Sequence, residues 1–273
     1  MGAALQVLNF YSTSLTGGAF EALTAGTGDS ATIQTTNQTP AGYLSEIWGL
    51  DDTNVCEISI TATRFHDQTY GIRMALPDGG TLAPAGRPSC ISPLGVQQEI
   101  YDADVLSVKA NGTAADNVNV TFVNYYPNLP GIQFHGITVD QLSMLGGNNV
   151  GVRVSPTAGA GDWGTSVAMN SVTDLLHAGK DYALCGASSQ TPVAAFGIQG
   201  IDSGNLRVGG PLLGDPSIDQ ELFIRHAAAH KAPLIPVFQA NNAGAINIYA
   251  AHTTGGAVAI DLYLVELNQK VVS

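Results

Sequence analysis

Hydrophobic and polar residues alternate along much of this chain, which is the pattern of β-strands. Residues 117–122 read Asn-Val-Asn-Val-Thr-Phe, so the two valines and Phe122 share one face of an extended strand, and the asparagines and Thr121 share the other. The pattern returns near the C-terminus at Val258, Ile260, Leu262 and Leu264. One apolar and one polar face is typical of a sandwich or barrel strand whose outer face meets water.

Five further stretches have the composition of strands. The sequence predicts strands at 31–35, 56–62, 70–75, 182–185 and 194–199.

Helical periodicity is confined to three short segments. The strongest signal is in 217–232, where Ser217 or Asp219 supplies the N-cap, apolar residues follow at helical spacing, and Pro233 ends the pattern. Two other segments predict a short helix that ends at glycine: 138–147 and 169–179.

Four blocks of sequence recur in the same order in the two halves of the chain. Residues 36–55 and 188–206 both contain Gln-Thr-Pro, an apolar stretch, Gly-apolar-Asp and Asn-apolar. The other matched pairs are 24–31 with 177–183, 70–74 with 222–226, and 105–126 with 245–267. Because the four matches keep their order while loop lengths differ, the sequence predicts an internal duplication.

The last pair of blocks, 105–126 and 245–267, has two alternating segments around a polar turn that contains glycine. This pattern predicts a β-hairpin at the end of each half. Two copies of roughly 120–140 residues with several short strands fit an eight-stranded jelly roll. A duplicated immunoglobulin-like sandwich is the main alternative. We therefore predict an all-β chain of two tandem jelly rolls with few short helices, residues 1–130 and 131–273.

Composition and charge narrow the class of protein. Charged residues make up 12% of the chain, and 32 Gly and 13 Pro suit short strands joined by turns. Ten Lys and Arg against 22 Asp and Glu give a net charge of −12, which argues against direct binding of nucleic acid. The sequence predicts neither a signal peptide nor a membrane span.

The chain has three cysteines, Cys56, Cys90 and Cys185. This number is too small for a disulfide framework. We expect buried thiols in a reducing compartment, with one disulfide and one free thiol as the alternative.

Two patterns suggest catalysis or metal binding, and each has a simpler interpretation. Gly-Asp-Ser at 28–30 resembles a stretch of one esterase class in which serine is the nucleophile, but the matching block has Tyr182 at the serine position, which favours a turn. His226 and His230 are spaced to face one metal ion from a helix. Only alanines lie between them and no third ligand is indicated, so we expect packed or exposed histidines.

Two groups of acidic and aromatic residues are candidates for a glycosidase or sugar-binding site. The candidate acids are Asp51, Asp52, Asp202, Asp215 and Asp219, and the candidate aromatics are Trp48, Trp163, Tyr125, Tyr126 and Phe134. Asp51 and Asp202 match between the repeats and precede Asn54 and Asn205 at the same spacing, which favours turn-capping roles. The aromatics are sparse, which favours core or subunit contacts. The sequence thus predicts no catalytic, cofactor-binding or metal-binding residue and no enzyme.

A tandem pair of small jelly rolls, each with a short helix ahead of its final hairpin, resembles the double jelly-roll major capsid proteins of icosahedral viruses that often enclose a membrane. The resemblance rests on the repeated blocks and the strand pattern over nearly the whole chain. It implies a structural virion protein, without cofactors, that forms pseudo-hexameric homotrimers. Neighbouring trimers, minor capsid proteins and an underlying membrane would be its partners, and the capsid shell its location after synthesis in the host cytoplasm.

The chain departs from that family in two respects. It is short, which leaves little room for large outer towers, and it has no basic cluster to face a membrane. Two other functions stay open on the sequence: a carbohydrate-binding or receptor-binding β-sandwich protein, and a two-domain β enzyme that acts on glycans. A shell subunit should purify at about three times its mass of 28.2 kDa or larger.

Overall fold

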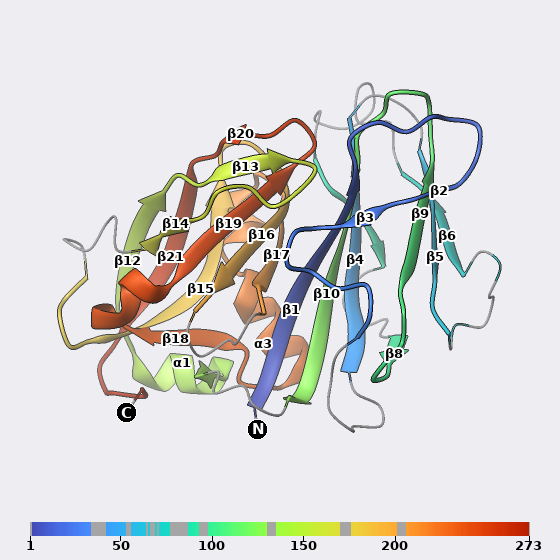
Figure 1. Cartoon of the computed structure of the whole chain (residues 1–273). Coiled ribbons are helices and arrows are strands. Elements are labelled where there is room, and N and C mark those ends of the chain that lie inside the picture. The colour runs from blue at the N-terminus through green and yellow to red at the C-terminus, as the bar shows by residue number, and fades with distance from the viewer. Residues whose placement is uncertain are drawn as a thin grey trace.

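The fold was analysed in a computed structural model, which describes residues 2–33, 42–52, 56–63, 65, 69, 71–76, 87–92, 98–129, 135–169, 176–200 and 206–272. Most of the described residues lie in strands, which form four sheets. Figure 1 shows the strands as two groups side by side, one from each half of the chain, with both termini at the same end of the molecule. The prediction of an all-β fold with few short helices is confirmed.

The N-terminal half contributes two sheets. The first is formed by β1 (Gly2–Ser12), β3 (Thr24–Ala25), β4 (Gly42–Asp51), β7 (Ser89–Ser92), β8 (Gln98–Ile100) and β10 (Val118–Leu129). Its order is β3-β1-β10-β4-β7, and β8 also pairs with β4. The second is formed by β2 (Glu21–Ala22), β5 (Glu57–Thr61), β6 (Ile72–Ala75) and β9 (Ser107–Asn111), in the order β2-β9-β5-β6.

The C-terminal half also contributes two sheets. The first is formed by β11 (Gly136–Ile137), β12 (Gly146–Val154), β15 (Asp181–Ser189), β18 (Ile235–Gln239) and β21 (Ile260–Leu267). Its order is β11-β18-β15-β21-β12. The second is formed by β13 (Thr157–Ala160), β14 (Val167–Ala168), β16 (Val193–Gln199), β17 (Val208–Leu212), β19 (Asn247–His252) and β20 (Gly256–Ala257). Its order is β17-β16-β19-β13-β20, and β14 pairs with β19.

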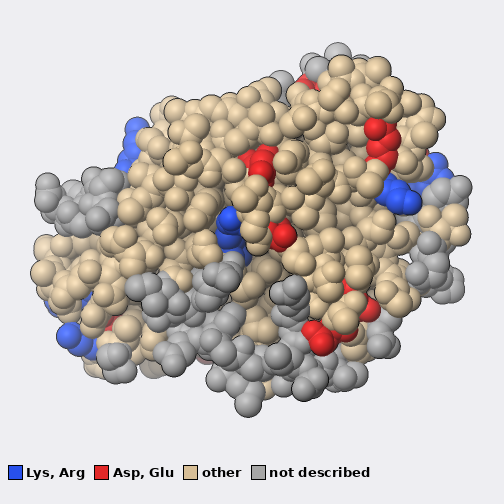
Figure 2. Space-filling model, in the orientation of Figure 1, with Lys and Arg blue, Asp and Glu red and all other residues tan. Residues whose placement is uncertain are grey.

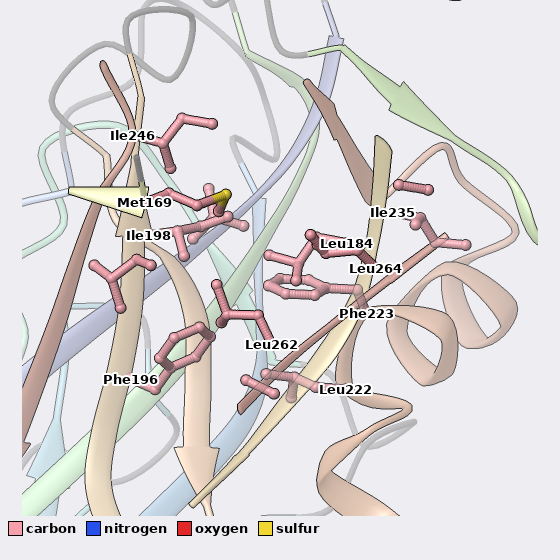
Figure 3. Packing of buried hydrophobic residues seen from close by; sticks show 14 of the residues in the cluster. Met169, Leu184, Phe196, Ile198, Leu222, Phe223, Ile235, Ile246, Leu262 and Leu264 are labelled. Atoms are coloured by element: carbon pink, nitrogen blue, oxygen red, sulfur yellow. The ribbon is translucent and has the colours of Figure 1, made fainter. Parts of the chain in front are cut away.

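Each half has its own main hydrophobic cluster. In the N-terminal half the rings of Phe10 and Phe122 meet edge to face, with centroids 5.3 Å apart. In the C-terminal half Phe196 and Phe223 pack with Leu262 and neighbouring aliphatic side chains, as Figure 3 shows. Each such side chain, fully buried, contributes about 1.5–3 kcal/mol to folding. These clusters bury the apolar positions of the alternating strands, as the pattern predicts.

Four of the five further predicted strands are present: β5, β6, β15 and β16 cover or overlap 56–62, 70–75, 182–185 and 194–199. In 31–35 the described part forms only an isolated bridge between Thr32 and Val105, and residues 34–35 lie outside the described residues.

The first predicted short helix is confirmed as α1 (Val139–Leu145). Thr138 accepts a hydrogen bond from the backbone of Gln141, and the Gln141 side chain accepts one from the backbone of Thr138, which forms a capping box. The helix ends at Gly146. Of the predicted helix at 169–179, residues 170–175 lie outside the described residues.

The segment 217–232 forms two helices instead of one, α2 (Pro216–Asp219) and α3 (Leu222–His230). The cap of α2 is Asp215, and not Ser217 or Asp219 as predicted. The junction between the helices lies against Gly186 of β15, where a Cβ atom would be 2.4 Å from the carbonyl oxygens of Asp219 and Gln220. The close backbone approach at this glycine is a tertiary contact that helical periodicity does not report. On α3, the apolar residues Leu222, Phe223 and Ala227 are buried.

Both predicted hairpins are wrong. β9 pairs with β2 and β5, whereas β10 pairs with β1 and β4, so the turn between them joins two sheets. β19 and β21 are likewise in different sheets. A hairpin and an arch between facing sheets share one sequence pattern, because in both cases each strand turns alternate residues toward the same core.

The matched sequence blocks do not all occupy corresponding places. Residues 36–55 include β4, which pairs with β10, the last strand of its half, whereas 188–206 include β16, which pairs with β19 and β17. Residues 70–74 include part of β6, but 222–226 form the start of α3. The repeated letters therefore reflect shared strand and turn preferences in these blocks, and not equivalent positions.

Candidate functional site: a buried polar interface between the halves

The polar face of β10 is buried, although the sequence pattern predicts that it meets water. Asn119 and Thr121 are each 1% exposed. Strands β1 and β10 contact β16 and β17, so the C-terminal half covers this face. Thr121 Oγ1 donates a hydrogen bond of 2.8 Å to the carbonyl of Ala194, and Asn119 Nδ2 donates one of 2.7 Å to the carbonyl of Gly161. The prediction is corrected: the polar face of β10 forms a junction between the halves.

Strand β1 takes part in the same junction. Asn9 Nδ2 donates to the carbonyl of Gly161 at 2.7 Å, and Asn9 Oδ1 accepts from Asn119 Nδ2 at 2.8 Å. Gly161 has a φ of +76°, and a Cβ atom there would lie 2.4 Å from the Tyr11 ring. The positive φ and the close contact both require glycine at this position. Each such hydrogen bond contributes about 0.5–1.5 kcal/mol, and leaving a buried partner unsatisfied costs more.

Arg207, the residue before β17, is the centre of a charged cluster at this junction. Its Nη1 lies 2.9 Å from Asp29 Oδ1, and its Nη2 donates to the carbonyl of Thr27 at 2.8 Å. The guanidinium carbon lies 4.8 Å from the ring centroid of Trp163 and 4.7 Å from that of Tyr249. The Arg207 side chain is 9% exposed. It is held both by a charge-assisted hydrogen bond and by cation–π contacts in a largely buried site.

Asp29 links this cluster to the N-terminal half. Its Oδ2 accepts hydrogen bonds from Trp163 Nε1 at 2.6 Å and from the backbone N–H of Asn9 at 2.9 Å. Burial raises the pKa of Asp29 to about 6, against the lowering effect of these donors and of Arg207. The carboxylate therefore depends on partners from the other half, and the loss of one would leave a buried charge uncompensated.

A second cluster joins β4 to α3. Glu46 of β4 is 2% exposed and accepts a hydrogen bond of 3.0 Å from Trp48 Nε1. From α3, Arg225 Nη1 lies 3.6 Å and His226 Nε2 lies 3.5 Å from its carboxylate oxygens. Burial acts to raise the pKa of Glu46, but the contacts with His226, Trp48 and Arg225 outweigh it and hold the pKa below its usual value.

His230, one turn further along α3, also reaches the N-terminal half. Its Nε2 lies 2.9 Å from Ser45 Oγ, and its ring stacks on Tyr125 with centroids 3.9 Å apart. Burial, together with nearby His226, lowers the pKa of His230 to about 4, so the imidazole is neutral at pH 7. A serine and a histidine at this distance have the spacing of a nucleophile and its base. Ser45 is 0% exposed, however, so this geometry suits a contact between the halves better than a reaction with a substrate.

The structure gives the other flagged residues mainly turn and packing roles. Ser30 Oγ accepts from the backbone of Thr32 at 3.1 Å, as expected for a turn. Asp52 accepts from the backbone and side chain of Asn117, Asp215 caps α2, and Asp219 accepts from the backbone of Leu213. Asp51 is buried at the end of β4. Asn54, Phe134, Asp202 and Asn205 lie outside the described residues.

The flagged aromatics divide between the junction and the core. Trp48, Trp163 and Tyr125 lie in the two clusters between the halves, and Tyr126 is buried with its hydroxyl 2.8 Å from Gln6 Oε1. Sequence reasoning did not single out Arg207 or Glu46. The available signal was a charged residue inside a strongly apolar stretch, in a chain with few charges.

The cysteines are free thiols: Cys56 and Cys185 are buried, whereas Cys90 is exposed, contrary to the expectation. Among the described residues, no group of three or more His, Cys, Asp or Glu could hold a metal ion. No described helix is both long enough and apolar enough to span a membrane. A cavity of about 140 Å³ lies in the C-terminal half, lined mainly by apolar side chains with His135, Gln239 and Asn242.

No protein-family model and no curated protein sequence matches this chain. Among solved structures, one described as "Recombinant peptide: N-glycanase F (PNGase F)" aligns over 98% of this chain and 97% of its own, at 12% identity and a TM-score of 0.24. A TM-score this low carries no argument about the fold or function of this chain.

Proposed function

We propose that this protein is the major capsid subunit of an icosahedral virus, built from two tandem jelly rolls with a boundary near residue 130. The observation that supports it is the route of the chain through the sheets. In strand order, the sheet β1-β10-β4-β7 corresponds to β12-β21-β15-β18, and β2-β9-β5-β6 corresponds to β13-β19-β16-β17, except that β13 runs parallel to β19 whereas β2 runs antiparallel to β9.

The chain also visits the paired sheets of each half in one order. If the sheet that holds the first and last strands is called I and its partner II, these eight strands follow the order I, II, I, II, II, I, II, I in both halves. Eight strands in two sheets with this alternation are the architecture of a jelly roll. This route does not depend on the matched sequence blocks, several of which fall on different strands.

Two similar but unequal modules in one chain suit a shell subunit. Three chains then present six similar modules, so one gene product can tile a surface through repeated lateral contacts. Tiling requires that the two modules keep a fixed relation. The buried clusters around Arg207 and Glu46 supply that rigidity, because separating the halves would remove the partners of several buried charges.

The net charge of −12 bears on the contents of such a shell. An acidic layer is repelled by the phosphates of a genome. The proposal therefore places another layer, a membrane or minor proteins, between this subunit and the nucleic acid.

Light scattering of the purified chain tests the proposal. It should give about three times the subunit mass of 28.2 kDa, or larger assemblies. Electron microscopy of those assemblies should show tiles with six similar lobes. A clean monomer at high concentration that binds a glycan array would contradict the proposal and favour a carbohydrate-binding β-sandwich protein.

A further inference from the structure

The contact between the halves joins two unlike faces. The N-terminal half offers the outer face of its sheet of first and last strands, represented by β1 and β10. The C-terminal half offers the outer face of its other sheet, represented by β16 and β17. This contact uses one sheet face of each half. The outer face of the other sheet in each half takes no part in it.

We infer that the two unused faces bind each other between copies of this chain. One is the outer face of β12 and β21, here called face Q, with Gly151, Arg153, Asp261, Tyr263 and Val265. The other is the outer face of β5, β6 and β9, here called face P, with Glu57, Ser59, Arg73 and Lys109. A Q-to-P contact would repeat between chains the packing already present within one chain. The inference rests on the proposed function, since a head-to-tail contact of this kind closes into a ring or tile.

The charges of the two faces suit burial against a copy of the same acidic chain. Face Q holds an ion pair in which Arg153 Nε and Nη2 lie 2.6 and 2.7 Å from the two carboxylate oxygens of Asp261. Face P holds the ion pair of Arg73 with Glu57, and Lys109 is exposed beside it. These faces carry three of the ten basic residues and two acids, although the chain as a whole has a net charge of −12. Copies can therefore approach through P and Q with less repulsion than through an average part of the surface.

Face Q leaves room for a partner, whereas Ser59 in the middle of face P is 3% exposed. At Gly151 a Cβ atom would have no neighbour within 4 Å, so the space above β12 beside Tyr263 is open. Face P carries Phe20 against Arg73, with the guanidinium carbon 5.2 Å from the ring centroid. Aromatic and arginine side chains are the residues most enriched at the centres of protein interfaces. Figure 2 shows how sparsely charges are spread over one side of the molecule, with wide uncharged areas between them.

Two substitutions block the faces separately. Gly151→Arg places a bulky side chain on face Q, where it meets nothing in its own chain. Lys109→Glu reverses an exposed charge on face P. Met144→Arg is the matched control, because Met144 is 73% exposed on α1, outside both faces. Circular dichroism and thermal unfolding should show that all three variants fold like the wild type.

The expected results are specific to a head-to-tail contact. Wild type and Met144→Arg should measure about three times 28.2 kDa, and each face variant should measure as a monomer. An equal mixture of Gly151→Arg and Lys109→Glu at high concentration should form a complex of two chains and no larger, because one intact Q meets one intact P. If either face variant keeps the wild-type size, or if the mixture stays monomeric while wild type assembles, the assignment of the faces is overturned and the capsid proposal stands. If wild type itself is monomeric, both are overturned.

Discussion

Strands β10 and β21 have the same place in their halves and the same alternating pattern, but different surroundings. The inward residues of both are buried in a hydrophobic cluster. On the outward side, Asn119 and Thr121 of β10 are 1% exposed, whereas Asp261 and Tyr263 of β21 are only half-buried. A polar strand face therefore indicates that the face lies outside the hydrophobic core, and not that it meets water. Asn and Thr served here to make hydrogen bonds to the other half of the chain.

The largest difference in the free energy of unfolding should come from two arginine–carboxylate pairs. Arg207 pairs with Asp29 at the junction between the halves, and Arg153 pairs with Asp261 on β12 and β21. Arg207→Met leaves Asp29 buried without its cation, which should lower the free energy of unfolding by about 3–5 kcal/mol. Arg153→Met breaks an exposed pair that solvent screens, so it should cost far less than Arg207→Met. Urea unfolding of both variants measures this. Equal losses in the free energy of unfolding would show that the Arg207 cluster is as accessible to solvent as the Arg153 pair.

Two glycines give the next largest contrast. Gly161→Ala must adopt a φ of +76° and approach the Tyr11 ring, which should cost about 1–3 kcal/mol. Gly151→Ala meets nothing within 4 Å and needs no positive φ, so it should be neutral or slightly stabilising. Thermal unfolding separates the two variants, and a neutral Gly161→Ala would contradict the described packing of the junction.

A smaller effect is expected from single polar groups. Thr121→Val removes the hydrogen bond to Ala194 and leaves that carbonyl without its hydroxyl donor, at a cost of about 1–2 kcal/mol. Tyr263→Phe removes only the 3.2 Å contact with Ser188 on the more open face and should change stability by less than about 0.5 kcal/mol. Chemical denaturation compares the pair. Similar losses of stability in the two variants would mean that the outer faces of β10 and β21 are equally exposed to solvent.

A pH dependence is also expected at the junction. The pKa of His230 is lowered to about 4 in the folded chain, so the unfolded chain binds the proton first as pH falls. Its contribution to stability is fully present above the unfolded pKa of about 6.5 and is lost as pH falls toward 4. His230→Gln removes this group, so stability should fall less than in wild type between these pH values. A parallel pair of stability curves would argue against the buried placement of His230.

The sequence predicted those features that depend on residues close together in the chain. Alternation located the apolar faces of β10 and β21, and the glycines at 146 and 147 marked the end of α1. It did not distinguish a hairpin from an arch between sheets, because both obey the same period. Nor did it find Arg207, whose partners Asp29 and Trp163 are distant in the chain. The predicted helix at 217–232 is divided where its backbone lies against Gly186 of β15, which is also a tertiary contact.

Cysteine labelling tests most directly whether the outer face of β10 is closed within one chain and that of β21 is left for a second copy. In a Cys90→Ser background, which removes the exposed thiol, Thr121→Cys and Tyr263→Cys are compared with a maleimide reagent. Thr121→Cys should stay unreactive both in the assembled protein and in the monomer formed by Lys109→Glu, whereas Tyr263→Cys should react only in the monomer. Equal labelling of the two cysteines in the folded monomer would contradict the account.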